Sequence, residues 1–171
     1  MKHQKLYHLV LAALFAALTY VATNIIHVPI PATDGYINLG VCVVLLGAFL
    51  LGPVYGAAAG GIGSALADII SGYAVFAPGT FVIKALIAVI AAAILKALGS
   101  KTKAAPIVAS IAGEAWMLLG YFLYESIFLG YGLAAAGSIG GNAIQAVAGV
   151  ILASALYAVL SKVPQIKKAA A

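Results

Sequence analysis

The chain has 171 residues, of which 65% are hydrophobic and 8% are charged, and its mean hydropathy is +1.16. So few charged side chains cannot cover the surface of a soluble domain, which excludes soluble enzymes and soluble nucleic-acid-binding proteins. The net charge of +5 comes from nine lysines against four carboxylates, without any arginine. The composition therefore predicts an integral membrane protein.

Six hydrophobic runs follow one another along the chain. A helix needs about 20 residues to cross the hydrocarbon core, and runs of this length without alternation favour helices over the strands of a membrane β-barrel. We therefore predict an all-α integral membrane protein with six transmembrane helices in a single membrane domain, residues 1–171. The expected spans are residues 6–26, 36–52, 53–72, 80–98, 105–129 and 138–161.

The lysines predict the orientation of the chain. All but Lys84 lie before the first run, from the end of the fourth run to the start of the fifth, or after the last run. Lysine-rich loops stay in the cytoplasm, so these three zones are expected on one side of the membrane. An even number of spans also places both termini on one side, and we predict that the amino and carboxyl termini are cytoplasmic. The eight lysines are Lys2, Lys5, Lys96, Lys101, Lys103, Lys162, Lys167 and Lys168.

Small residues in the first and third runs indicate close helix packing. In the first run, Ala12 and Ala16 are four positions apart, and Ala13 and Ala17 repeat this spacing in the neighbouring register. Such pairs let two helix backbones approach closely, so they indicate either internal packing or a partner helix. The third run follows Gly52-Pro53 and is rich in glycine, but it lacks the Gly-Lys-Ser/Thr ending of a phosphate-binding loop.

Metal and cofactor sites are not expected. Cys42 is the single cysteine, which excludes an internal disulfide and a cysteine-based metal site. The three histidines, His3, His8 and His27, lie at or beyond the ends of the first run and lack the spacing of zinc ligands.

Polar side chains inside the spans are the main candidates for function, because a charged group at the centre of a membrane helix costs about 2.5–3.5 kcal/mol on insertion scales. In the predicted topology they come from five helices and lie in the outer half of the membrane, except Glu114, which is deeper and could instead be a protonated structural group. A few polar groups in an apolar setting are typical of a small-molecule site, so we predict a pocket that opens outward. Its candidate substrate-binding residues are Asn38, Asp68, Lys84, Glu114, Tyr121, Glu125, Asn142 and Gln145, with Trp116 and Tyr124 as further aromatic walls.

Structural explanations of the same polar residues stay open. Lys84 could form an ion pair with Asp68 or with Glu125 and leave one carboxylate over. Asn142 and Gln145 could hydrogen-bond between helices only to hold them together. A ligand-free membrane scaffold or assembly protein would use the groups in this way, with the outer hollow filled by side chains.

Five sequence segments form a specific pattern when taken together, and they extend over nearly the whole chain. The segments are GYINLG at 35–40, LLGPVYGAAAGGIGSALADIISGY at 50–73, PGTFVIKALIA at 78–88, GEAWMLLGYFLYE at 113–125 and GNAIQAVAGV at 141–150. This pattern resembles the S components, the substrate-binding membrane subunits of energy-coupling factor (ECF) vitamin transporters. The resemblance implies six membrane helices with both ends cytoplasmic and a binding pocket near the outer face.

The resemblance also implies a function and partners. The subunit is expected in a prokaryotic cell membrane, where it is no enzyme but binds a vitamin or vitamin precursor from outside and closes loops over it. The implied partners are a transmembrane coupling subunit and two ATP-binding subunits. An AxxxA motif in the first helix, which docks on the coupling subunit in this family, matches Ala12/Ala16 or Ala13/Ala17.

The nearest subgroup is the one linked to pyridoxine or to the hydroxymethylpyrimidine precursor of thiamine. Both are small heteroaromatic alcohols that aromatic side chains, a carboxylate and an amide can hold by stacking and hydrogen bonds. The chain departs from its relatives at Val41, because they read INLGD and carry an aspartate at this position. We expect this change to alter specificity or affinity if that aspartate contacts the ligand.

Overall fold

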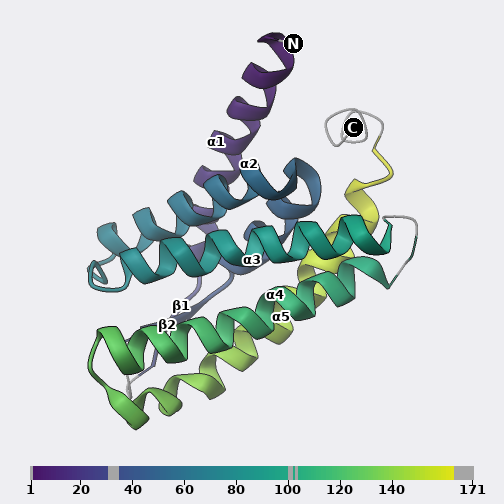
Figure 1. Cartoon of the computed structure of the whole chain (residues 1–171). Helices are drawn as coiled ribbons and strands as arrows, with labels where there is room; N and C mark the ends of the chain where they lie inside the picture. Colours follow the sequence, from purple (N-terminus) through teal and green to yellow (C-terminus); the bar gives the residue numbers. More distant parts are fainter. Residues whose placement is uncertain (1, 31–34, 100–101, 103, 164–171) are drawn as a thin grey trace.

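The computed structural model describes residues 2–30, 35–99, 102 and 104–163 (Figure 1). Long helices make up most of this part of the chain. The elements in chain order are α1 (Lys2–Ile25), β1 (His27–Ile30), β2 (Gly35–Asn38), α2 (Gly40–Ile70), α3 (Ala77–Leu98), α4 (Ala105–Leu123), a π-helical turn (Tyr124–Phe128), a 3₁₀ helix (Gly132–Ser138) and α5 (Ile139–Leu160).

Within the described residues, five helices are long and apolar enough to cross a membrane, judged by length and composition. The difference from the six predicted spans lies in α2, which contains both residues 36–52 and residues 53–72 in part. The helix is broken at Gly52, whose φ of 77° is left-handed, and Pro53 follows without an N–H to donate. Its two arms, residues 40–51 and 53–70, then pack against each other.

Glycines allow these two arms to touch. A Cβ atom added to Gly56 would lie 2.8 Å from Cα of Ala48, and one added to Gly60 would lie 2.8 Å from Cγ1 of Val44. Since residues 48 and 56, and residues 44 and 60, are about equally far from Gly52, the arms run in opposite directions. The small residues of the third run therefore serve packing inside the chain.

We expect Gly56→Ala to lower the thermal stability of the purified protein, because the new methyl group meets the backbone of Ala48 and forces the arms of α2 apart. Overpacking of this kind costs about 1–3 kcal/mol. Labelling of the buried Cys42 by a thiol-reactive fluorophore on heating measures the unfolding temperature. Gly140→Ala is the matched control, since a Cβ at Gly140 meets nothing within 4 Å. Equal unfolding temperatures for the two variants would contradict the packing of the arms.

The structure agrees with the prediction of an all-α membrane protein, apart from one short β-hairpin among the described residues. Strands β1 and β2 pair antiparallel, with His27 opposite Asn38 and Ile30 opposite Gly35. The helix that was expected from residue 36 therefore begins only at Gly40. The reason is that Gly35–Asn38 satisfies its backbone hydrogen-bonding groups by pairing with β1 instead of entering the helix.

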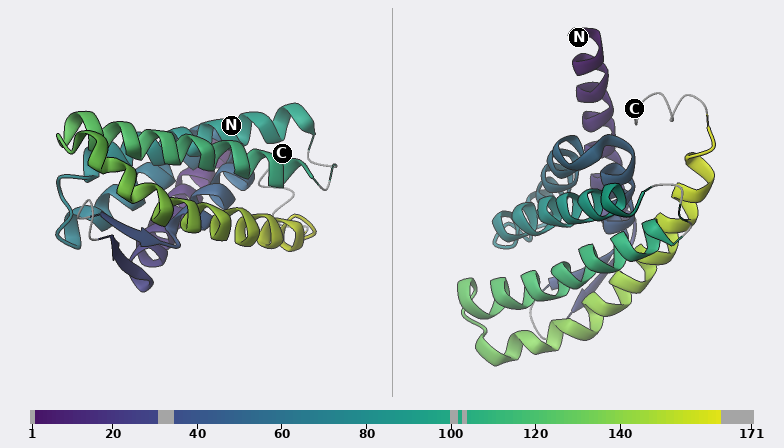
Figure 2. Two further views of the ribbon diagram at one scale, coloured as in Figure 1. Left: turned by 90° about the horizontal axis from the view of Figure 1, so that it is seen from below. Right: turned by 45° about the vertical axis from the view of Figure 1, so that its right-hand side comes forward.

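Helix α2 is the centre of the packing, with α1 and α3 against it and with α4 and α5 completing the bundle (Figures 1 and 2). Most of α2 is buried, whereas most of α1 is exposed, and the amino-terminal half of α1 projects away from the other helices (Figure 2). Gly63 lets α1 approach, because a Cβ at this position would collide with the backbone oxygen of Ala16.

The two ends of the bundle differ in chemistry. At one end, the hairpin, the connector after α2 and the carboxyl end of α4 meet: Ser71 donates to Asn24 Oδ1 at 2.5 Å, and the hydroxyl of Tyr124 donates to the Val75 oxygen at 2.8 Å. This is the left-hand side of α3 and α4 in Figure 1. The break of α2 and the connector between α3 and α4 lie at the other end.

The described lysines outside the spans are found at this other end. Lys5 lies near the start of α1, Lys96 in the last turn of α3, and Lys162 just after α5. Lys101, Lys103, Lys167 and Lys168 are outside the described residues.

Candidate functional site

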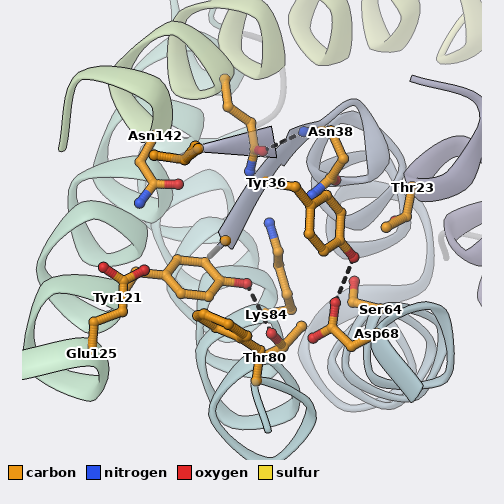
Figure 3. Close-up of a pocket in the computed structure, with 14 residues that line it drawn as sticks. Thr23, Tyr36, Asn38, Ser64, Asp68, Thr80, Lys84, Tyr121, Glu125 and Asn142 are labelled. Atoms are coloured by element: carbon orange, nitrogen blue, oxygen red, sulfur yellow. Dashed lines mark hydrogen bonds between the residues drawn. The ribbon is translucent and has the colours of Figure 1, made fainter. Parts of the chain in front are cut away.

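A pocket lies at the hairpin end of the bundle, between the β-hairpin and the helices (Figure 3). Its cavity volume is about 20 Å³, so the lining side chains stand close together, as the scaffold alternative predicted. Fourteen residues line it: Thr23, Ile30, Gly35, Tyr36, Asn38, Ser64, Asp68, Phe76, Thr80, Lys84, Tyr121, Glu125, Asn142 and Gln145.

Most of the residues that were proposed from the sequence meet in this pocket, although they come from β2, α2, α3, α4, the π-helical turn and α5. Seven of the eight candidate substrate-binding residues line it, and the exception is Glu114. The seven are Asn38, Asp68, Lys84, Tyr121, Glu125, Asn142 and Gln145.

Lys84 is buried in the pocket wall without a carboxylate partner. Only 1% of the residue is exposed, and its Nζ donates to Sδ of Met117 at 3.4 Å and lies 5.6 Å from the centre of the Tyr121 ring. No carboxylate oxygen of the described residues comes within 4.0 Å of it, so neither Asp68 nor Glu125 forms the ion pair that the sequence left open. A buried cation in this state has most of its hydrogen-bonding capacity unused.

Carboxylate oxygens in the same pocket also lack partners. The hydroxyl of Tyr36 donates to Asp68 Oδ1 at 2.5 Å, while Asp68 Oδ2 and Glu125 Oε2 are buried without a hydrogen bond from any described residue. The hydroxyl oxygens of Thr23 and Ser64 are in the same situation. Since buried polar groups in folded proteins are normally hydrogen-bonded, this cluster is suited to a ligand that brings its own donors and acceptors.

Two amide side chains of the pocket, Gln145 and Asn38, hold its elements together, and a third, Asn142, only lines it. Gln145 Oε1 accepts a hydrogen bond from the backbone N–H of Asn38 at 2.7 Å, which ties α5 to the hairpin. Asn38 Oδ1 accepts from the backbone N–H of Gly40 at 2.9 Å, which caps the start of α2. Asn142 lines the pocket in the first turn of α5. The interhelical role predicted for the amides applies to Gln145, whose Nε2 donates to Sδ of Met117 on α4 at 3.2 Å.

A π-helical turn positions Glu125. Leu129 N donates to the oxygen of Tyr124, five residues earlier, at 3.1 Å, which is the hydrogen-bond pattern of a π-helix. Such turns are rare in proteins, and those that occur are often at functional sites. The extra residue of the π-helical turn changes the direction of Glu125 relative to a continuous α-helix. Glu125 is 2% exposed and lines the pocket.

The aromatic wall differs from the expectation. Tyr36, Phe76 and Tyr121 line the pocket, and the Tyr121 hydroxyl lies 3.1 Å from Oγ1 of Thr80. Trp116 and Tyr124, proposed as further walls, lie instead in an apolar groove between α3 and α4. Whether these two rings face the pocket or the groove depends on their direction around the helix axis, which could not be predicted from the sequence.

Glu114 lies outside the pocket. It is 2% exposed, and a Cβ added to Gly149 of α5 would lie 2.6 Å from Glu114 Oε1 and 2.8 Å from Cγ1 of Val41. Glu114 therefore faces α5 in the interior of the bundle, one to two turns from the pocket residues of α4. Val41 is fully buried beside it and does not line the pocket, so in this chain the position of the relatives' aspartate belongs to the packed core.

Aromatic rings stack on the hairpin beside the pocket. The ring of His27 lies on that of Tyr36 with a centroid distance of 3.8 Å and an angle of 14°, and Tyr73 lies 4.7 Å from Tyr36. Burial, and after it the Asp68 carboxylate, raise the pKa of Tyr36 well above its usual value, so this hydroxyl stays protonated and donates to Asp68. Burial lowers the pKa of His27 below its usual value of 6.5.

We expect the hairpin to loosen as the pH falls through about 6.5, because the unfolded chain binds a proton at His27 more readily than the folded hairpin does. Hydrogen–deuterium exchange of the two strands, corrected for intrinsic rates, should therefore be faster at about pH 5.5 than at about pH 7.5. His27→Phe keeps an aromatic ring on Tyr36 and should remove the difference. An equal pH effect in both proteins would exclude His27 as its source.

Sequence reasoning missed several lining residues. Thr23, Tyr36, Ser64 and Thr80 line the pocket but were not among the proposed residues. Hydroxyl side chains are common in membrane helices, so Thr23 and Thr80 carry no distinctive signal. Tyr36 did carry one, because residues two apart on a strand face the same side, and Tyr36 and Asn38 are two apart.

A second surface lies on α1. Its alanines line an apolar groove together with the second arm of α2, including Ala58, Ile62 and Leu66. Ala12 is buried and Ala16 is half-buried against Gly63, whereas Ala13 and Ala17 are exposed. The Ala12/Ala16 register thus packs inside the chain, and the Ala13/Ala17 register faces outward.

Comparison with known proteins identifies the family of the chain. Residues 3–162 match the family model described as "ECF-type riboflavin transporter, S component". An uncharacterized protein in the gap 3′ region of Pyrococcus woesei is 38% identical to the chain over 142 residues, which are 83% of this chain and 93% of that protein. The chain is a multi-pass prokaryotic membrane protein, and it belongs to the family of ECF-type transporter S components whose model carries this description.

Proposed function

We propose that the chain is the substrate-binding subunit of an ATP-driven importer and that it binds a small heteroaromatic vitamin or vitamin precursor in the pocket under the β-hairpin. In this proposal the two arms of α2 cross the membrane separately, which gives six crossings and places both termini in the cytoplasm with the lysines. The pocket then faces the outside.

The observation that carries this proposal is the set of unpartnered polar atoms in the pocket. Lys84 Nζ has a thioether as its hydrogen-bond acceptor, and the oxygens Asp68 Oδ2 and Glu125 Oε2 lack donors among the described residues. Groups of this kind are expensive to bury for packing alone, and a scaffold would pair them with one another. A bound ligand would satisfy all three.

We infer that the ligand is a one-ring compound of the pyridoxine or hydroxymethylpyrimidine type. A ring nitrogen or amino group would meet a carboxylate, a hydroxyl oxygen or ring nitrogen would accept from Lys84, and Tyr121 and Phe76 would contact the ring faces.

The partners follow from the family and the exposed alanines. An S component delivers its substrate through a transmembrane coupling subunit and two ATP-binding subunits. Of the two alanine registers predicted to dock the coupling subunit, we propose Ala13/Ala17, because these residues are exposed beside the groove on α1 and Ala12/Ala16 are not.

Isothermal titration of the detergent-purified protein with pyridoxine, hydroxymethylpyrimidine and riboflavin tests the proposal. We expect submicromolar affinity for one of the two one-ring compounds and at least 100-fold weaker binding to Asp68→Asn and Asn142→Ala. Riboflavin binding with the same dependence on these residues would retain the pocket and overturn the substrate. Full affinity in both variants would refute the site.

A further inference from the structure

Met117 joins two of the pocket's polar side chains, although it does not line the pocket itself. Its Sδ accepts a hydrogen bond from Lys84 Nζ at 3.4 Å and another from Gln145 Nε2 at 3.2 Å. Met117 is fully buried on α4, between α3, which carries Lys84, and α5, which carries Gln145. One sulfur atom is thus the common acceptor for donors from two other helices.

A thioether is an unusual acceptor for a buried ammonium group. Its sulfur carries no charge and accepts weakly, so it orients Lys84 without neutralising it. A carboxylate in the same place would form an ion pair and leave the lysine unavailable to a ligand. The sulfur uses one of the three N–H donors of Lys84, and the other two have no acceptor among the described residues.

The same sulfur also fixes the orientation of Gln145. Because Gln145 Nε2 donates to Met117, Gln145 Oε1 is turned toward the backbone N–H of Asn38. It accepts a hydrogen bond from this N–H at 2.7 Å. The network therefore runs from β2 through Gln145 and Met117 to Lys84, and it connects the hairpin over the pocket with the lysine in its wall.

From this geometry we propose that Met117 is a positioning residue for ligand recognition: its thioether holds Lys84 and Gln145 in the orientation that the ligand meets. The inference rests on the proposed function in that the ligand is a substrate of the pocket. Leucine at position 117 would preserve apolar volume but would leave Lys84 and Gln145 without their common acceptor.

The first test needs no ligand. The chain has two methionines, Met1 and Met117, so labelling with [methyl-¹³C]methionine gives a resonance for Met117 that Met117→Leu identifies. In the ligand-free protein we expect this resonance to move in Lys84→Leu and in Gln145→Leu. Thr80→Val is the matched control, since Thr80 is a pocket residue whose hydroxyl contacts Tyr121 instead, and it should leave the resonance in place. No shift in the first two variants, or an equal shift in the control, would overturn the proposal.

The second test uses pyridoxine as the probe in isothermal titration. We expect Met117→Leu to bind at least tenfold more weakly, and selenomethionine-labelled protein, which keeps an acceptor of similar size, to bind like the unlabelled protein. The loss caused by Lys84→Leu should be smaller in the Met117→Leu background than in the wild type, because the lysine is then already misdirected. Additive losses would reduce Met117 to a packing role and contradict the proposal. If wild-type protein does not bind pyridoxine, hydroxymethylpyrimidine replaces it as the probe; if it binds neither, the proposed substrate fails, and the resonance test alone decides the role of Met117.

Discussion

Replacing Lys84 by leucine is expected to abolish vitamin binding and, at the same time, to raise the thermal stability of the ligand-free protein. Lys84 is 1% exposed and has no carboxylate within 4.0 Å among the described residues, so its charge lacks a direct ion pair, and Glu114 and Asp68 act on it only from a greater distance. Desolvating a buried charge costs several kcal/mol, and without a close partner to offset that cost its removal is expected to stabilise the fold. We expect a rise of about 2–8 °C in the unfolding temperature and at least 100-fold weaker binding, measured by thermal unfolding and titration calorimetry.

Lys96→Leu is the control for both readouts. Lys96 lies exposed in the last turn of α3, on the same helix as Lys84 but at the opposite end of the bundle. Its replacement should change neither the affinity for the ligand nor the unfolding temperature by a comparable amount. A marked loss of stability in Lys84→Leu would contradict the functional interpretation, because it would mean that the lysine stabilises the fold.

The second large effect concerns transport without loss of binding. We expect Ala13→Leu and Ala17→Leu to abolish ATP-dependent uptake in cells that produce the coupling and ATP-binding subunits, while the purified variants bind the vitamin like the wild type. Two leucine side chains in place of exposed alanines keep a partner helix from approaching the groove on α1. The pocket is untouched, because neither alanine lines it.

Ala93→Leu provides the comparison for this effect. Ala93 is also an exposed alanine in a long apolar helix, but it lies on α3 and lines neither the pocket nor the groove on α1. Uptake by this variant should match the wild type. Normal uptake by Ala13→Leu and Ala17→Leu together would show that the outward register of α1 is not the docking surface.

Charge and hydropathy were sufficient to predict the membrane class and the position of the polar cluster. A lysine such as Lys84 inside an apolar run is costly to expose to lipid, and it was therefore expected in a shared interior with Asp68 and Glu125. The structure brings these three residues to one pocket. What the lysine contacts could not be predicted, because Met117 gives no signal in a sequence that is 65% hydrophobic.

The hairpin was missed because its strands have four residues each and border a hydrophobic run. Periodicity over so short a stretch does not separate a strand from the first turn of a membrane helix. The consequence was a helix start placed at residue 36 instead of Gly40 and the omission of Tyr36, which donates to Asp68.

The residues of α4 show a different limit. Glu114 precedes Tyr121 and Glu125 by seven and eleven residues, and this spacing would put all three on one face of a continuous α-helix. The π-helical turn at Tyr124–Phe128 interrupts the α-helix and changes the direction of Glu125. Glu114 lies too far along the helix axis to line the pocket. Angular position and depth are independent, and a single sequence gives the first better than the second.

Mass spectrometry of the small molecules released from freshly purified protein tests the central claim most directly. If the polar atoms around Lys84 form a vitamin site, the wild-type protein should release a heteroaromatic vitamin or precursor in near-equimolar amount, and Lys84→Leu prepared in parallel should release none. Release of the same compound in equal amount from both proteins, or failure of the wild type both to release one and to bind pyridoxine, hydroxymethylpyrimidine or riboflavin, would contradict it.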